Sequence, residues 1–340
     1  MRRLTTRLRR RALVRRLAEE RGASAVMVAL LLVPLLGCGA IAVDVASYYS
    51  DRVQLQGAAD AAALAIAADC AKGNCGNTAR TAEATQNTYA AAADRGDAAL
   101  RTPAVSVNSG QRRVTVTTSA DAAHWFAPVF GDASSRVTTR ATASWAPTSA
   151  ALAKFPLVIS WCEYVRQMNR DPSGTQTFRV NATTELTGET CTGPDGSTPV
   201  QAGYAVTNGD RGNAACGTTS SVDGMVSQYT GMYTTFYRLP VSCSDTYLGS
   251  LLRTTIIVPI WDRMTGSPGT AQFHVFAYAA FYIEGYDYLY TPDDPALIGR
   301  FSRAALPSDV GVTAGVSRTA PDLAAMNPAF RGAYSVFLDS

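Results

Sequence analysis

Hydrophobic residues are concentrated in one uninterrupted run close to the start of this chain. Residues Ala23 to Val43 carry no charged side chain, and these 21 positions are enough for a helix to cross the roughly 30 Å hydrocarbon core of a bilayer. From Asp44 to Ala68 apolar and polar residues recur with helical spacing, and no clear helix breaker interrupts them. We therefore predict one continuous helix, about 70 Å long at 1.5 Å per residue, whose first half spans a membrane.

The second half of this helix is amphipathic and rich in alanine, which predicts a packed face. Helical spacing groups five residues on that face: Val53, Gln56, Ala59, Ala63 and Ile66. An adjacent small-residue face holds Leu55, Ala58, Ala62 and Ala65. Since alanine lets two backbones approach closely, we expect the helix to pack within the chain's own core. Docking against the long helix of a partner, as pilin-type subunits do, is the alternative.

Beyond this helix the hydrophobic period shortens to two, which is typical of strands. The pattern predicts a helix at 77–93, a hairpin of 104–107 with 113–117, a short helix at 121–130 and a strand at 135–145. The residues expected in its core are Val105, Val107, Val114, Val116, Trp125, Phe126, Val137 and Trp145. This order resembles a pilin-like module of a helix plus a β-meander over residues 44–148, closed by a linker at 148–152.

The second half of the chain is richer in Tyr, Thr, Gly and Cys, and it alternates strand-like runs with turn signals. The run from Pro156 to Cys162 is one predicted strand, and the run from Gln272 to Tyr286 is the longest. The long run includes Glu284 and too many β-branched and aromatic residues for a second membrane span. We predict a mostly β domain at 155–290 that residues 291–340 extend, and an α+β fold class overall.

The distribution of charge gives the first helix a direction. The first 22 residues hold nine Arg against Glu19 and Glu20, whereas the rest of the chain holds 21 basic and 25 acidic residues, a net charge of −4. Arg-rich segments stay on the cytoplasmic side of a membrane. We therefore expect a cytoplasmic leader at 1–22, a transmembrane helix at 23–43 and an extracytoplasmic remainder. The Arg run is explained by orientation and by anionic lipid, so no nucleic acid partner is expected.

Six cysteines follow the apolar span: Cys70, Cys75, Cys162, Cys191, Cys216 and Cys243. An even set in an exported region indicates disulfides, because that compartment is oxidising. Cys70 and Cys75 are expected to close a small loop. Among the 15 possible pairings we favour sequence neighbours for the others, Cys162 with Cys191 and Cys216 with Cys243. No C-x-x-C is present, which argues against a zinc ribbon or a thioredoxin-type redox pair.

The seventh cysteine, Cys38, lies inside the apolar span and permits two interpretations. Leu35, Leu36 and Gly37 before it fit a lipobox, in which Cys38 would be acylated and become the mature N-terminus. However, residues 39–43 stay apolar, whereas a lipoprotein normally becomes polar and flexible after that cysteine. A packed cysteine within a membrane helix is therefore the favoured interpretation.

Residues that carry out catalysis are sparse. The two histidines, His124 and His274, lie in apolar-aromatic surroundings without a recognisable nucleophile beside them in sequence. The chain has no G-x-S-x-G, H-E-x-x-H, P-loop or G-x-G-x-x-G motif. Asp293 and Asp294 form a pair in a Pro-flanked turn, where a capping role is favoured over an acid–base pair. We expect a non-enzymatic protein with no catalytic residue, no cofactor and no metal.

Three strings at fixed distances carry a family resemblance. RGASAVMVALLLVPLLG, then AVDVASYY, then RVQLQGAADAAALA resemble the N-terminal anchor of TadG-like proteins of the bacterial Flp/Tad pilus assembly machinery. The resemblance covers about 50 of the 340 residues and includes a charged stop at Asp44 and the pair Tyr48 and Tyr49. The strings TTIIVPIWDRMTG and FHVFAYAAFYIEGY are more faintly similar to the extracytoplasmic part of actinobacterial members.

This resemblance implies a single-pass protein of the bacterial cell membrane whose partners are other Tad/Flp pilus assembly proteins or pseudopilins. Tad pseudopilins are cut after a Gly whose fifth following residue is Glu. Gly22 is in the right place, but Met27 occupies the fifth position, which argues against this cleavage. Longer relatives carry a metal site with a D-x-S-x-S motif. The nearest string here, from Asp195 to Pro199, lacks the last Ser, so no metal is expected.

Two other classes of function remain as alternatives. One is an exported binding lipoprotein or hydrolase, which would need a pocket or a cluster of catalytic residues. The other is a surface adhesin presented by the membrane helix. Cells that lack an adhesin would form pili normally but attach poorly.

Overall fold

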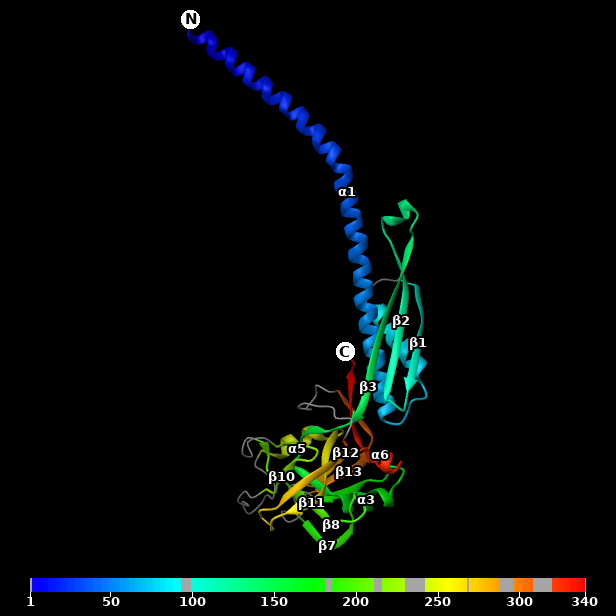
Figure 1. The fold of residues 1–340 in the computed structure, drawn as a ribbon. Helices are drawn as coiled ribbons and strands as arrows, with labels where there is room; N and C mark the ends of the chain where they lie inside the picture. Colours follow the sequence, from blue (N-terminus) through cyan, green and yellow to red (C-terminus); the bar gives the residue numbers. More distant parts are fainter. Residues whose placement is uncertain are drawn as a thin grey trace. The chain divides into compact units, whose positions relative to one another are not determined.

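A computed structural model describes residues 2–92, 99–181, 185–210, 216–229, 242–267, 269–287, 296–307 and 320–339. Its longest element is α1 (Arg2–Ala71), which passes through Pro34 without ending (Figure 1). The prediction of one continuous helix is therefore confirmed. Among the described residues, α1 is the one helix long and apolar enough to cross a membrane.

A helix, a hairpin and a third strand follow α1, as predicted. They are α2 (Thr78–Ala92), β1 (Ala99–Asn108), β2 (Arg113–Ala123) and β3 (Ser134–Pro147). The predicted short helix at 121–130 is wrong. β2 continues through its first three residues because Ala120 and Ala122 alternate inward and pack with Leu55 and Val137. The helical part of 121–130 is a single 3-10 turn, η1 (Ala127–Phe130).

The first sheet has five strands in the order β1-β2-β3-β15-β14. Its last two strands, β14 (Ala304–Pro307) and β15 (Ala333–Leu338), come from the C-terminal tail. β15 runs antiparallel to β3, with Tyr334 opposite Pro147 and Leu338 opposite Ala143. The tail therefore completes a sheet that was begun more than 150 residues earlier in the chain.

The second sheet has eight strands in the order β6-β13-β12-β11-β5-β8-β7, and β10 also pairs with β12. Its strands are β5 (Leu157–Ser160), β6 (Phe178–Asn181), β7 (Glu185–Thr192), β8 (Pro199–Val206), β10 (Met225–Ser227), β11 (Thr255–Thr265), β12 (Gln272–Asp287) and β13 (Ala296–Ser302). The long strand predicted at 272–286 is confirmed as β12. It is central because both edges pair and its middle, Ala277–Phe281, is buried.

Two predictions around residue 150 are wrong. The proposed linker includes β4 (Ala150–Ala153), which pairs antiparallel with β9 (Thr218–Ser221). The strand predicted from 156 to 162 ends at Ser160, where α3 (Trp161–Arg170) begins. Two further helices are short, α5 (Asp245–Leu251) and α6 (Leu323–Met326).

An N-cap at Ser160 explains the start of α3. The Ser160 hydroxyl accepts the Glu163 N–H at 3.0 Å, and it also accepts the Gly203 N–H at 3.0 Å. Ser followed three residues later by Glu is a known start signal for helices. The strand-like residues that precede Ser160 concealed this signal in the sequence.

The chain divides into two compact units, each interrupted in sequence. The first comprises residues 1–59, 83–104 and 117–140, and the second comprises 60–82, 105–116 and 141–340. The core of the second unit is rich in aromatic rings that meet edge to face, such as Tyr164 with Phe301 at 5.2 Å and Phe281 with Phe301 at 5.1 Å between centroids. The small core of the first unit contains Leu55, two alanines and Val137. The α+β fold class is confirmed.

Candidate functional site

The surroundings of α1 change at Asp44. Before it, the large apolar side chains are exposed, with exposed fractions from 49% at Val43 to 73% at Val33. At Asp44 the exposed fraction falls to 8%. Apolar side chains of this size are strongly disfavoured in water, at about 1.5–3 kcal/mol for each one left exposed. The exposed stretch therefore suits hydrocarbon and the stretch that follows suits a protein core.

The Asp44 carboxylate binds the backbone of the segment that joins β2 to β3. One oxygen, Oδ1, accepts the Trp125 N–H at 2.8 Å, and Oδ2 accepts the Ala127 N–H at 2.9 Å. The Phe126 N–H points at both oxygens, at 3.2 and 3.3 Å. Burial by itself raises the pKa of Asp44, but these three N–H groups outweigh burial and hold the pKa below its usual 3.8.

Asp44 begins a buried stripe that continues along α1. The stripe follows helical spacing and consists of Asp44, Ser47, Asp51, Leu55, Ala58, Ala59, Ala62, Ala63, Ile66, Ala67 and Cys70. In the first unit Leu55 packs on Ala120 and Ala122 of β2 and on Val137 of β3. Most members are small, so the helix backbone can lie close to its neighbours.

This stripe differs from the face that the sequence predicted. Ala59, Ala63 and Ile66 are at most 1% exposed, but Val53 is 52% exposed. Val53 precedes Leu55 by two residues, which is about 200° of helical rotation, so the two side chains point in nearly opposite directions. Leu55, Ala58 and Ala62 of the adjacent small-residue face are buried as well, so the buried stripe combines parts of both predicted faces.

Polar side chains of the first unit also bind the helix to the sheet. The Gln56 side chain donates to the Arg140 carbonyl at 3.3 Å. The buried Thr118 hydroxyl lies 3.2 Å from the Leu55 carbonyl and 2.8 Å from the Thr139 hydroxyl. These bonds satisfy polar groups that would otherwise be buried without partners.

Three disulfides are present, each between cysteines that are neighbours in sequence. Cys70–Cys75 closes the turn that ends α1, where Gly73 has φ +86°. Cys162–Cys191 connects α3 to β7, and Cys216–Cys243 connects the start of β9 to the residues before α5. Cys38 is a free thiol and is exposed on the apolar half of α1.

A polar cavity of about 370 Å³ lies beside α3 in the second unit. Glu163, which is 2% exposed, accepts hydrogen bonds from the Tyr204 hydroxyl at 2.7 Å and the Gln167 amide at 2.8 Å, and it is paired with Arg166. The carboxylate is therefore held by three groups of its own chain. This network attaches α3 to β8.

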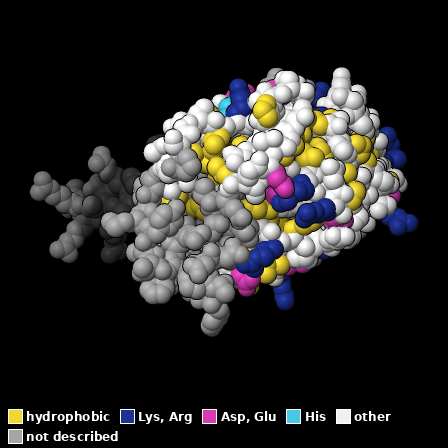
Figure 2. Space-filling model, turned by 90° about the horizontal axis from the view of Figure 1, so that it is seen from below, with side chains coloured by type: hydrophobic (Ala, Val, Ile, Leu, Met, Phe, Trp, Pro, Cys, Tyr) yellow, Lys and Arg dark blue, Asp and Glu magenta, His cyan; other side chains and the backbone are white. Residues whose placement is uncertain are grey.

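The hydroxyls of this cavity also have partners. Thr177 donates to Glu284 at 2.8 Å, and Thr187 donates to the Ala202 carbonyl at 3.2 Å. On the face shown in Figure 2, basic and acidic side chains are interspersed among hydrophobic patches. The cavity is only partly satisfied by its own polar groups, because Gln167 Oε1 and Arg166 Nε are buried without a hydrogen-bond partner among the described residues.

Each histidine has a polar partner. His124 Nε2 lies 2.7 Å from the Ser135 hydroxyl, but both oxygens of nearby Asp44 accept backbone N–H groups instead of orienting the ring. In the second unit, His274 Nδ1 lies 2.6 Å from Asp262. Within the described residues, neither histidine has the serine, histidine and carboxylate geometry of a hydrolase.

Two carboxylate segments stand out in the sequence, and neither is expected to be a metal or catalytic site. Asp195 accepts the N–H groups of Ser197 and Thr198 at 2.9 and 2.8 Å, as in an Asx turn. The Thr198 side chain and these N–H groups lower the pKa of Asp195 to about 2. Asp293 and Asp294 lie outside the described residues. Within the described part of the chain, no three His, Cys, Asp or Glu side chains form a group that could hold a metal ion.

Residues 22–69 match the family described as "Putative Flp pilus-assembly TadE/G-like". The match covers the apolar half of α1 and nearly all of the buried stripe, and it ends just before Cys70. No curated protein and no solved structure matches the chain.

Proposed function

We propose that this protein, which carries a Tad domain in residues 22–69, is a non-enzymatic, membrane-anchored component of a Tad/Flp pilus assembly or secretion apparatus. The observation that carries the proposal is the division of α1 at Asp44. One half exposes its apolar side chains and the other half is packed, and the family match spans both halves.

The proposed topology is a cytoplasmic leader at 1–22, a transmembrane helix from Ala23 to Val43 and an extracytoplasmic remainder. The nine Arg of the leader favour the cytoplasmic side. The three disulfides favour an oxidising compartment for everything after the span. The two observations are independent, and they support the same orientation.

The proposed organisation of the exported part is a stalk module at 44–148 and a β-rich domain at 155–290 with an extension at 291–340. Residues Val53, Gln56, Ala59, Ala63 and Ile66 were the first candidates for the packing face. Of these, Ala59, Ala63 and Ile66 are buried within the chain itself. The exposed side of α1, where Val53 lies, is the surface that we propose for other pilus assembly proteins or pseudopilins.

The decisive experiment determines the N-terminus and topology of the protein in its native membrane. Intact mass should give an uncleaved chain, because Met27 replaces the Glu that prepilin peptidases require. The matched variant Met27→Glu restores that residue and should be cut after Gly22. A wild-type chain that begins at Ala23 would contradict the permanent anchor, and one that begins at an acylated Cys38 would indicate a lipoprotein.

A deletion strain distinguishes the assembly role from the adhesin alternative. Loss of surface pili is expected, because an assembly component acts before the filament appears. Complementation with the full chain should restore pili. Normal pili with poor attachment would instead support an adhesin and contradict the assembly role.

A further inference from the structure

The segment between β2 and β3 exposes large apolar side chains that the sequence predicted to be buried. Trp125 is 71% exposed, Phe126 is 46% exposed and Val129 is 84% exposed. We call residues 124–132 the hairpin tip. Three large apolar residues within five positions form an exposed patch, and such patches mark contact surfaces.

The hairpin tip is attached to the helix at the end of the apolar span. The Asp44 carboxylate, which accepts the N–H groups of 125–127, belongs to the first residue after Val43. Both parts lie in the first compact unit, and Figure 1 shows the tip beside α1. Tyr49, another aromatic residue that is 66% exposed, follows Asp44 by five residues, about 7.5 Å along the helix.

The backbone of the hairpin tip is well suited to a membrane interface. Besides the three N–H groups that Asp44 binds, those of Val129, Gly131 and Asp132 donate to carbonyls within the tip at 3.1–3.3 Å, and that of His124 donates to the Ala133 carbonyl at 3.0 Å. Pro128 has no N–H group. A loop with satisfied donors can approach the hydrocarbon boundary without the cost of unpaired polar groups.

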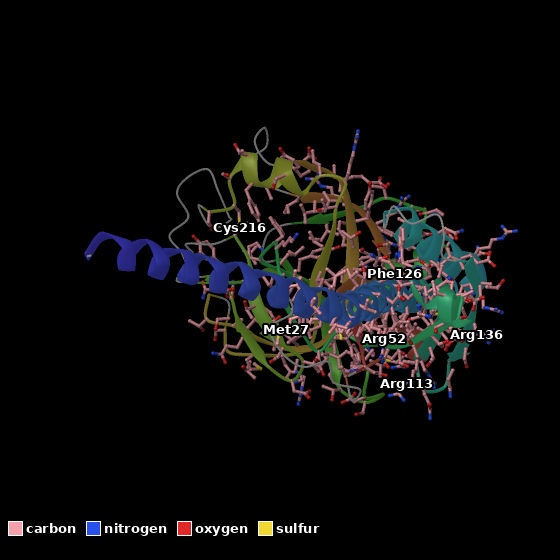
Figure 3. The ribbon with its side chains drawn as sticks, turned by 90° about the horizontal axis from the view of Figure 1, so that it is seen from above. Met27, Arg52, Arg113, Phe126, Arg136 and Cys216 are labelled. Atoms are coloured by element: carbon pink, nitrogen blue, oxygen red, sulfur yellow. A yellow bond between two sulfur atoms is a disulfide. The ribbon has the colours of Figure 1, made fainter. Side chains whose placement is uncertain are left out.

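We propose that the hairpin tip is a second membrane contact, with Trp125, Phe126 and Val129 inserted into the outer-leaflet interface beside the transmembrane helix. Trp favours this region because its ring is apolar and its N–H is polar. Asp132 and Arg136 are exposed beside the patch, which limits the contact to a shallow depth. Figure 3 shows Phe126 and Arg136 on this part of the chain.

A lipid surface is a better occupant than a protein partner because the proposed transmembrane segment of the same helix ends at Val43. The next residue, Asp44, binds the hairpin tip, so the tip lies at the membrane boundary. The tip cannot move far from the bilayer while Asp44 holds its backbone. The inference rests on the anchor of the proposed function and adds a second point of attachment, which would restrict tilting of the exported part relative to the membrane.

Tryptophan fluorescence in proteoliposomes tests this proposal with the full chain. The other three tryptophans, Trp145, Trp161 and Trp261, are at most 7% exposed, so Trp125 is the one that reports contact with lipid. Lipids brominated on the acyl chain should quench part of the emission. Trp125→Phe should remove that quenched component and leave the other emission unchanged.

A label on Cys38 separates failure of the tip from failure of the anchor. Cys38 is the free thiol, and the other six cysteines are in disulfides, so a bimane maleimide would label it selectively. Quenching of both Cys38-bimane and Trp125 supports the proposal. Quenching of the label alone overturns the second contact and leaves the anchor intact. Quenching of neither overturns both.

A pair of surface variants provides a further test that does not depend on folding. Val129→Glu places a charge in the exposed patch and should reduce the Trp125 quenching by about twofold or more, since charged side chains avoid the interface. Met225→Glu changes a side chain that is 45% exposed in the second unit, and it should have no effect. Equal effects of the two variants would contradict the proposal.

Discussion

The two halves of α1, before and after Asp44, belong to one helix but have different surroundings: the first exposes its apolar side chains, and the second is packed in the protein. In residues 25–43 the large side chains are mainly Leu and Val, and they are exposed. In residues 44–71 alanine is the commonest residue of the buried stripe, with five of its eleven members, and Leu55 and Ile66 are the larger apolar members. The halves also differ in polarity, because 25–43 has no charged residue whereas 44–71 includes four Asp and one Arg.

Residue size explains how the apolar positions of the two halves differ. Lipid chains are fluid and fit around branched side chains, so a span can use large residues on every side. A packed protein interior is as dense as an organic crystal, and close approach of a helix to a sheet leaves space only for small side chains. Asp44 marks the boundary because its carboxylate binds the sheet unit directly after the lipid-facing stretch.

The largest expected effect comes from truncating the packed half. Ile66→Ala should lower the free energy of unfolding by about 3 kcal/mol, because it removes a side chain that is 1% exposed and leaves a cavity. Thermal unfolding of the full chain in detergent micelles, followed by circular dichroism, measures the change.

Val53→Ala is the matched control for Ile66→Ala. Val53 is 52% exposed, so its truncation should alter the free energy of unfolding by no more than about 0.5 kcal/mol. Similar losses for the two variants would mean that both sides of this part of the helix are packed.

Replacing an alanine by a larger residue should destabilise the packed half of α1 and leave the exposed half unaffected. Ala63→Leu inserts methylene groups at a position that is 0% exposed and should destabilise the fold by about 1–3 kcal/mol. Ala29→Leu makes the same change on the exposed half, where lipid can accommodate it, and should leave thermal unfolding unchanged. A loss of stability at Ala29 comparable to that at Ala63 would show that the first half also packs against protein.

The smallest effect concerns pH and the boundary residue. The folded-state pKa of Asp44 is lowered, so its stabilisation is complete above the unfolded pKa near 3.8 and is lost as the pH falls through the folded-state value. Hydrogen exchange of the amides of 125–127, corrected for intrinsic rates, should accelerate as the pH falls below about 3.8. In Asp44→Asn the exchange should already be faster at neutral pH and should show no such step. An unchanged pH dependence in the variant would contradict this role of the carboxylate.

Local signals in the sequence were sufficient for several elements. An uninterrupted apolar run predicts a helix wherever it occurs, and β12 followed from its β-branched and aromatic residues. The presence of disulfides, which was predicted from the compartment, is confirmed. At α3 a local signal is present in Ser160 and Glu163, but the strand-like run before it favours a strand.

Other features had no local signal. The partners of Asp44 lie 81–83 residues away, so its sequence neighbours could not reveal them. Trp125 and Phe126 were expected in the core because aromatic residues usually are. Their exposure follows from the extension of β2 to Ala123, which places them in the turn beyond the sheet.

The sequence by itself determined the apolar span, its continuation as one helix, the charge asymmetry across it and the long central strand, because each depends on composition or spacing within one segment. The tertiary structure alone decided which side of α1 is buried, where β15 pairs and what Asp44 binds. These depend on contacts between segments far apart in the chain, and such contacts form only when the whole fold brings the segments together.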